Sequence, residues 1–163
     1  KNKLVPLIET SRAIETVTQI AAFKDVVGLF FGAADASASL GCKLAWEPLL
    51  YARHRVVLAA SMFNLFTIDA PYFYIDKMAG LKEEAEAVKN LGFTGKAAIH
   101  PDQIDYINEA FSPSAEEKAE AKKVLEEYQK SGGGAIKVDG QMIDEPIAEA
   151  MRLKITLGEE EKK

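Results

Sequence analysis

The sequence predicts an α/β protein built on a parallel sheet. Between residues 4 and 130, four short apolar runs each precede an amphipathic segment, and polar residues follow the ends of these runs. The runs lack polar alternation, which indicates strands covered on both faces. Four β-then-α units imply parallel strands with right-handed crossovers. Either an open doubly wound sheet or part of a (β/α)8 barrel satisfies this pattern.

The elements follow one another in a regular order. The predicted strands are Leu4–Ile8, Val26–Phe31, Leu65–Ile68 and Lys96–Ile99. The predicted helices are Ser11–Phe23, Glu47–Met62, Lys77–Leu91, Asp102–Phe111 and Ser114–Lys130. Gly92 is placed to cap a helix C-terminus, and Ser112-Pro113-Ser114 is a helix start signal. A loop of small residues, Gly32–Lys43, is expected after the second strand.

The composition changes after the fourth unit. Ser131–Gly134 is interpreted as a flexible hinge. Ala135–Val138 and Gln141–Ile143 flank the turn Asp139-Gly140 and predict a small hairpin. Pro146 fits the first turn of a last helix that reaches about Leu157. We therefore expect a sheet domain over residues 1–131 and a separate segment over residues 132–163.

Charge and composition narrow the function classes. The chain has 163 residues, 48% apolar and 28% charged, as in an ordinary globular domain. A formal net charge of −5 provides no basic surface for nucleic acid or anionic membranes, and no apolar run has the ~20 residues of a membrane span. The single cysteine, Cys42, favours a reducing, cytoplasmic location. The start at Lys1, without Met or signal peptide, indicates the edge of a fragment.

Two carboxylates follow neighbouring predicted strands. Glu9 comes after the first strand and Asp35 after the second. Mg²⁺ binds one or two carboxylates and completes its octahedron with water and substrate oxygens, so this pair could hold it. Both residues also precede helical segments, and spacing alone favours their being helix caps or dipole partners.

Other polar residues at the strand ends leave their roles open. His100 could act in acid–base chemistry, or its tautomer could be fixed by backbone hydrogen bonds. Asp69 could orient a ligand or make a structural hydrogen bond. His54 is expected on a solvated helix face, and Tyr72–Tyr74 could wall a channel or cover the end of a barrel. The segment Gly92–Lys96 lacks the spacing of a phosphate loop, and no zinc or serine-hydrolase motif is present.

Six segments resemble the citrate lyase β-subunit family of the HpcH/HpaI aldolase superfamily, in matching order and spacing. They are Leu4–Thr10, Phe31–Asp35, Leu49–Arg53, Thr67–Asp69, Gly95–Ile104 and Gly140–Pro146. The resemblance implies strands five to eight of a (β/α)8 TIM barrel followed by a C-terminal hairpin-helix lid. A complete barrel needs about 250 residues, so the chain is expected to be a portion of a longer protein.

The resemblance also implies roles for individual residues. The metal-binding Glu and Asp of the family fall on Glu9 and Asp35, and its catalytic lid Asp falls on Asp144. Arg53 and Lys96, with Arg55, are candidates to meet coenzyme A phosphates. Ala34 departs from the Glu that many members carry before the metal-binding Asp, which bears on substrate choice.

The activity implied is a Mg²⁺-dependent carbon–carbon lyase. Such an enzyme splits a citryl-, malyl- or citramalyl-coenzyme A thioester into an acetyl thioester and a 2-oxo acid. The alternatives are a malyl-coenzyme A thioesterase, a citrate lyase subunit acting on an acyl carrier protein thioester, and a non-catalytic binding domain. A homo-oligomer, trimer or hexamer, is expected because family lids close over neighbouring subunits.

Overall fold

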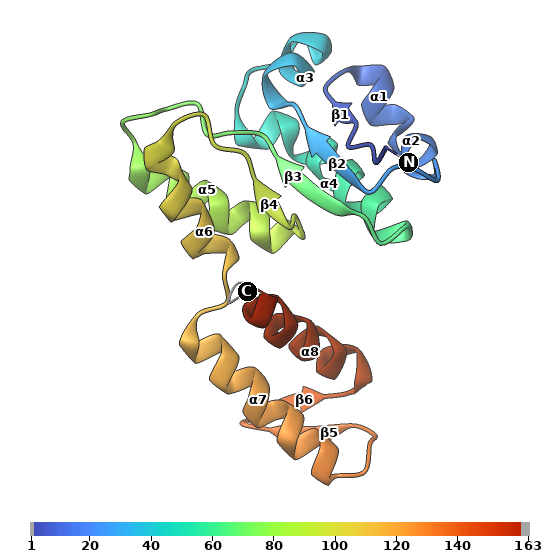
Figure 1. The fold of residues 1–163 in the computed structure, drawn as a ribbon, viewed down its shortest axis with the longest axis vertical. Coiled ribbons are helices and arrows are strands. Elements are labelled where there is room, and N and C mark those ends of the chain that lie inside the picture. The colour runs from blue at the N-terminus through green and yellow to red at the C-terminus, as the bar shows by residue number, and fades with distance from the viewer. Residues whose placement is uncertain (1, 161–163) are drawn as a thin grey trace. The chain divides into compact units, whose positions relative to one another are not determined.

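The computed structural model describes residues 2–160 and divides into two compact units (Figure 1). The first unit ends at Phe111 and the second begins at Ser112. Each unit has its own hydrophobic core. Among the described residues, no helix combines the length and the apolar character that crossing a membrane requires.

The first unit is built on a four-stranded parallel sheet. Its strands are β1 (Leu7–Ile8), β2 (Gly28–Phe31), β3 (Phe66–Asp69) and β4 (Gly95–Lys96). Each strand pairs with the next in the sequence, so these four strands show no reversal of order. The predicted α/β class and parallel pairing are confirmed, although the first, second and fourth strands are shorter than predicted.

The helices of the first unit follow the strands in alternation. They are α1 (Ser11–Glu15), α2 (Val17–Ala21), α3 (Ala33–Leu40), α4 (Trp46–Met62), α5 (Met78–Leu91) and α6 (Ile104–Phe111), with a 3₁₀ turn at Pro101–Gln103. The single helix predicted over Ser11–Phe23 divides at Thr16. Gly92 ends α5 with a φ of 101°, the left-handed cap that the sequence predicts.

The prediction of a loop over Gly32–Lys43 is wrong, because most of this segment forms α3. Its small residues are mainly alanines, which have the highest helix propensity. Gly41 then ends the helix in the left-handed conformation, with a φ of 67°. This helix decides where Asp35 lies, since the residue belongs to its first turn.

One face of the sheet is covered by helices and the other is open within this unit. Ile8, Leu29 and Phe31 are buried in the main core, together with Val56 of α4. Strand residues alternate between faces, and on the opposite face Leu7 remains 45% exposed. The prediction of strands covered on both sides therefore holds for one face of the described unit.

The second unit joins two helices to a hairpin. It contains α7 (Ala115–Lys130), β5 (Ile136–Val138), β6 (Gln141–Ile143) and α8 (Glu145–Glu160). The hairpin and the last helix are as predicted, and the start signal at Ser114 forms a capping box with Glu117.

The boundary between the units differs from the expected one after residue 131. The buried face of α7, with Leu125 and Tyr128, packs with Val138 and Ile143 of the hairpin. This shared core places α7 in the same compact unit as the C-terminal segment. Gly132–Gly134, interpreted as a hinge between domains, therefore turns the chain within the second unit, with φ values of 76°, 98° and 88°.

Candidate metal centre and a buried charge network

Glu9 and Asp35 leave the carboxyl ends of neighbouring strands. Glu9 directly follows β1 and is half-buried, whereas Asp35 is exposed in the first turn of α3, which follows β2. Because β1 and β2 are parallel, with Ile8 opposite Phe31, both residues lie at the same edge of the sheet. The structure thus brings the two predicted ligands to one edge.

Gly32 provides the space in which Glu9 lies. A Cβ atom placed on Gly32 would come 2.7 Å from Glu9 Cβ and 3.0 Å from Glu9 Oε2. The Gly32 amide donates to Ile8 O at 3.0 Å, which fixes the backbone just before α3. The Glu9 carboxylate is therefore seated against the chain that leads to Asp35.

The helix-cap alternative is wrong for Glu9. Thr10 caps α1, since its hydroxyl accepts from the Ala13 amide at 3.1 Å. Asp35 lies in the first turn of α3, so its charge can also interact favourably with the helix dipole, as the alternative interpretation expected. Within residues 2–160, no group of three or more His, Cys, Asp or Glu could hold a metal ion. Two carboxylates with water and substrate oxygens are nevertheless a set that Mg²⁺ accepts.

Asp69 lies at the centre of a buried charge network. Its side chain is fully buried, with Arg53 Nε at 2.8 Å from Oδ1 and Lys96 Nζ at 2.8 Å from Oδ2. Lys96 Nζ also donates to Glu84 Oε1 and Ala70 O, each at 2.7 Å. Two cations and two carboxylates make the formal charge zero. Asp69 was considered either to orient a ligand or to make a structural hydrogen bond. The bonds to Arg53 and Lys96 correspond to the structural role.

The network also accounts for the positions of Arg53 and Lys96. Lys96 has three acceptors for its three N–H donors, and its ammonium group is buried. A coenzyme phosphate could reach Lys96 only if these bonds opened. Arg53 is 4% exposed, and Arg55 donates to Glu15 O at 2.7 Å. Their coenzyme contact stays a prediction.

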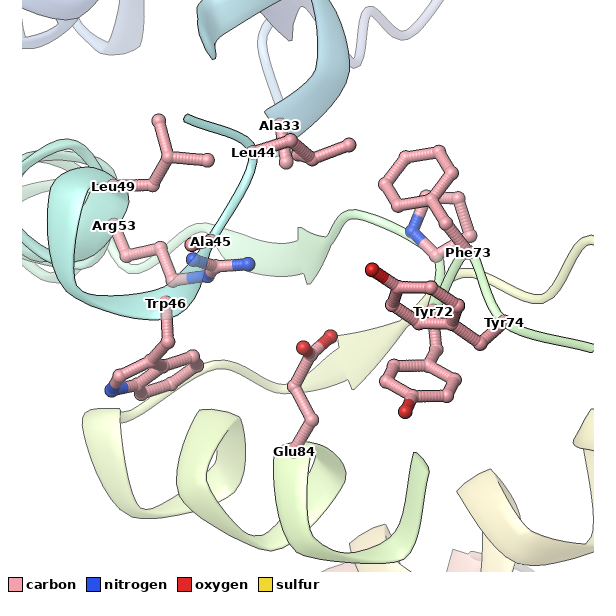
Figure 2. Close-up of a pocket in the computed structure, with 11 residues that line it drawn as sticks. Ala33, Leu44, Ala45, Trp46, Leu49, Arg53, Tyr72, Phe73, Tyr74 and Glu84 are labelled. Carbon is pink, nitrogen blue, oxygen red and sulfur yellow. The ribbon is translucent and has the colours of Figure 1, made fainter. Parts of the chain in front are cut away.

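A small hollow with aromatic walls lies beside the network (Figure 2). We call it the aromatic hollow, and its lining residues are Ala33, Leu44, Ala45, Trp46, Leu49, Arg53, Pro71, Tyr72, Phe73, Tyr74 and Glu84. Burial, and secondarily the Glu84 charge, raises the pKa of the Tyr72 phenol. The Tyr72–Tyr74 loop is recognisable in the sequence as a run of aromatic residues, but no local signal marks Trp46 or Glu84 as its neighbours.

Gln103 fixes the loop that forms one wall of the aromatic hollow. Its side chain is fully buried, donates to Tyr72 O at 2.9 Å and accepts from the Ile99 amide at 3.0 Å. Gly80 leaves room for the Tyr72 hydroxyl, which would lie 2.2 Å from a Cβ at that position. The wall is therefore held by specific packing.

Neither of the two histidines is among the residues that line the aromatic hollow. His100 Nδ1 accepts from the Asp102 amide at 3.3 Å and caps the 3₁₀ turn, which is the backbone-bonded role considered for it. His54 is exposed on α4, as predicted.

Asp144 belongs to the second unit, immediately before α8. It is half-buried, and its Oδ1 accepts from the Ile147 amide at 3.3 Å. The residue thus caps the last helix. Its catalytic role stays a prediction.

A parallel α/β unit with acidic side chains at its strand ends defines the general class, and sequence comparison gives the family. Residues 1–101 match the sequence model described as HpcH/HpaI aldolase/citrate lyase. The chain belongs to this family.

Three relatives illustrate the similarity. Mitochondrial citramalyl-CoA lyase from Homo sapiens is 36% identical over 94% of this chain and 49% of its own length. Citrate lyase subunit beta from Haemophilus influenzae is 32% identical over 93% of this chain and 54% of its own length. CitE from Mycobacterium tuberculosis, in a crystal structure with magnesium, acetoacetate and coenzyme A, matches with a TM-score of 0.87, at 32% identity over 96% of this chain and 61% of that one. The chain spans about half the length of the curated relatives it matches.

Proposed function

We propose that the protein is a Mg²⁺-dependent carbon–carbon lyase. Its substrate would be a coenzyme A thioester of a 3-hydroxy acid, of the citryl, malyl or citramalyl type, and its products an acetyl thioester and a 2-oxo acid. The observation that carries the proposal is the placement of Glu9 and Asp35 at the ends of two paired parallel strands. The relatives named citramalyl-CoA lyase and citrate lyase subunit beta support the reaction class.

We also propose that the first unit is half of a (β/α)8 barrel. Its strands lie in sequence order without the reversal of a doubly wound sheet, and one face of the sheet is open within the unit. The segment that would act as a lid is then the second unit, from Ser112 onward, because α7 shares its core. A homo-oligomer whose lids cover neighbouring subunits is part of this proposal.

The residues divide the chemistry between them. If Mg²⁺ is bound, it would supply Lewis acidity toward the substrate oxygen that changes from hydroxyl to carbonyl. Glu9 and Asp35 would hold the metal, and Gly32 leaves the space in which Glu9 lies against the strand end. Cleavage breaks the bond between the carbon bearing the hydroxyl group and the carbon next to the thioester. The hydroxyl proton would pass to solvent, and the electron pair of the broken bond would form the enolate of the acetyl thioester. Protonated Asp144 would then give its proton to the enolate carbon, which becomes the acetyl methyl group.

The metal assignment is tested by Glu9→Gln and Asp35→Asn in the full-length enzyme. Each change removes one anionic ligand, so we expect Mg²⁺-dependent turnover to fall at least ~100-fold, beyond the 10–100-fold usual for supporting residues. Titration calorimetry with Mg²⁺ should show the same loss of binding. Glu15→Gln, at an exposed carboxylate that ends α1, is the matched control. Retained Mg²⁺-dependent turnover in both ligand variants would refute the assignment.

A carrier-bound substrate is the second candidate, because some relatives are named citrate lyase subunit beta. Malyl-, citramalyl- and citryl-coenzyme A can be compared with a citryl acyl carrier protein, with and without Mg²⁺. Turnover of the carrier-bound substrate alone would assign the protein to a citrate lyase complex.

A further inference from the structure

The aromatic hollow does not include the residues proposed for metal binding and proton transfer, although Arg53, a candidate for coenzyme contact, lines it. Neither Glu9, Asp35 nor Asp144 lines it. Its cavity is about 70 Å³, and it is partly open to solvent. A single ring would therefore be held only in part, with one edge inside and its other edge at the mouth.

Arg53 lines the aromatic hollow and has one buried nitrogen without a partner among the described residues. The residue is 4% exposed, and its Nη1 has no hydrogen-bond partner among the described residues. Its guanidinium is held in position by Asp69 at 2.8 Å and by the ring of Trp46, whose centroid lies 4.7 Å away. Buried guanidinium nitrogens are normally satisfied, so this one is suited to an acceptor atom of a ligand.

The charges at the aromatic hollow favour a neutral ligand. Figure 2 shows the Arg53 guanidinium and the Glu84 carboxylate pointing toward the space between Trp46 and Tyr72. An anionic ligand would meet the charge of Glu84, and a cationic one would meet that of Arg53. A neutral group with an acceptor and a donor on one edge would match both.

The walls of the aromatic hollow favour a flat ligand. Trp46, Tyr72, Phe73 and Tyr74 supply four aromatic rings from two segments of the chain. Aromatic rings offer planar surfaces on which a planar group can stack. Because Gln103 and Gly80 fix the Tyr72 loop, the walls are in place before a ligand arrives.

We propose that the aromatic hollow binds a neutral planar ring with an amide-type edge, such as a nucleobase or an aromatic carboxamide. Its acceptor atom would bond to Arg53 and its N–H group to Glu84. The proposal does not depend on the lyase reaction, and its test does not use turnover.

Three probes of the same shape but different charge test whether the aromatic hollow prefers a neutral ligand. Benzamide is neutral, benzoate is an anion and benzamidinium is a cation. Trp46 is the only tryptophan among the 163 residues, so its indole N–H signal in NMR spectra reports on the aromatic hollow, and Trp46→Phe identifies that signal. We expect a saturable shift with benzamide and at least tenfold weaker binding of both charged probes.

Variants of the full chain locate the binding. Ala45→Leu should fill the mouth of the aromatic hollow from an exposed position and weaken benzamide binding at least tenfold. Leu58→Ala, on the exposed side of α4, should leave it unchanged. In folded protein, Arg53→Lys should abolish benzamide binding, because a lysine side chain has one nitrogen and cannot bond to Asp69 and to the ligand in the way that the three guanidinium nitrogens can. Equal or tighter benzoate binding, no saturation, or unaltered binding in Ala45→Leu would each overturn the proposal.

Discussion

At the scale of single residues, the position of Lys96 shows how burial fixes a role. Its ammonium group is surrounded by Asp69, Glu84 and the Ala70 carbonyl, without exposure of the side chain. Removing one member of a buried, neutral set leaves an uncompensated charge inside the protein, and this usually costs more than the intact set contributes. Lys96 therefore stabilises the sheet mainly by keeping the network neutral.

The change Lys96→Met should lower the free energy of unfolding by about 3–5 kcal/mol, because Asp69 and Glu84 would retain excess negative charge. Urea unfolding followed by circular dichroism measures the loss. Lys82→Met is the matched control, since Lys82 pairs with Glu109 where both side chains are at least half exposed. Exposed pairs contribute about 0–1 kcal/mol. Equal losses in the two variants would contradict the role of the network.

The position of Glu9 depends on Gly32, because the absence of a side chain at Gly32 leaves room for that of Glu9. The close approach of Glu9, whose Cβ would lie 2.7 Å away, leaves no space for a Cβ atom on Gly32. The same backbone leads into the first turn of α3, where Asp35 is placed. The geometry of both proposed metal ligands thus depends on a residue that supplies no ligand atom.

At the scale of elements, the start of α8 is linked to α7 by polar contacts. Arg152 Nη1 lies 2.7 Å from Glu145 Oε1, and this hydrogen bond, followed by one from the Tyr128 hydroxyl, lowers the pKa of Glu145. The Glu145 carboxylate also raises the pKa of Tyr128, although burial is the larger cause. These contacts add to the apolar core of the second unit.

The lowered pKa of Glu145 predicts an acid-sensitive second unit. A group with a depressed folded pKa contributes stability above its unfolded pKa, whose usual value is 4.5, and loses it as the pH falls through the folded pKa. Glu145→Gln should therefore destabilise the unit at pH 7 and reduce its loss of stability on acidification. Amide hydrogen exchange of α8 measures this, with exposed Glu126→Gln as control. An unchanged acid response in Glu145→Gln would argue against the prediction.

At the scale of the whole molecule, the proposed reaction requires residues from both compact units. Glu9 and Asp35 belong to the first unit and Asp144 to the second. A metal can therefore be held by one unit while proton transfer depends on the other. This division gives the two groups of residues different kinetic signatures.

Asp144→Asn in the full-length enzyme should lower kcat at least ~100-fold, the lower range for loss of a general acid or base, while KM and Mg²⁺ affinity stay near wild type. Steady-state kinetics and metal titration measure the three quantities. Because Asp144 also caps α8, asparagine is chosen to retain that capping hydrogen bond. A raised KM with normal kcat would indicate a structural contribution only.

The sequence by itself determined the features that depend on near neighbours in the chain. Apolar runs identified the four parallel strands, and local signals identified the Gly92 cap, the Ser114 helix start and the Asp139-Gly140 hairpin. Glu9 and Asp35 were noticed because acidic residues follow strand ends, and the family resemblance made them the candidate ligands. Such signals suffice since backbone propensity and capping act over a few residues.

Only the tertiary structure decided which distant side chains meet. The Asp69 network joins Arg53, Glu84 and Lys96 across separations of 12–27 residues, and α7 joins the hairpin through its buried face. The aromatic hollow likewise unites Trp46 with the Tyr72 loop. The physical reason is that burial and pairing depend on how whole elements pack, and no periodicity within one element specifies its partner.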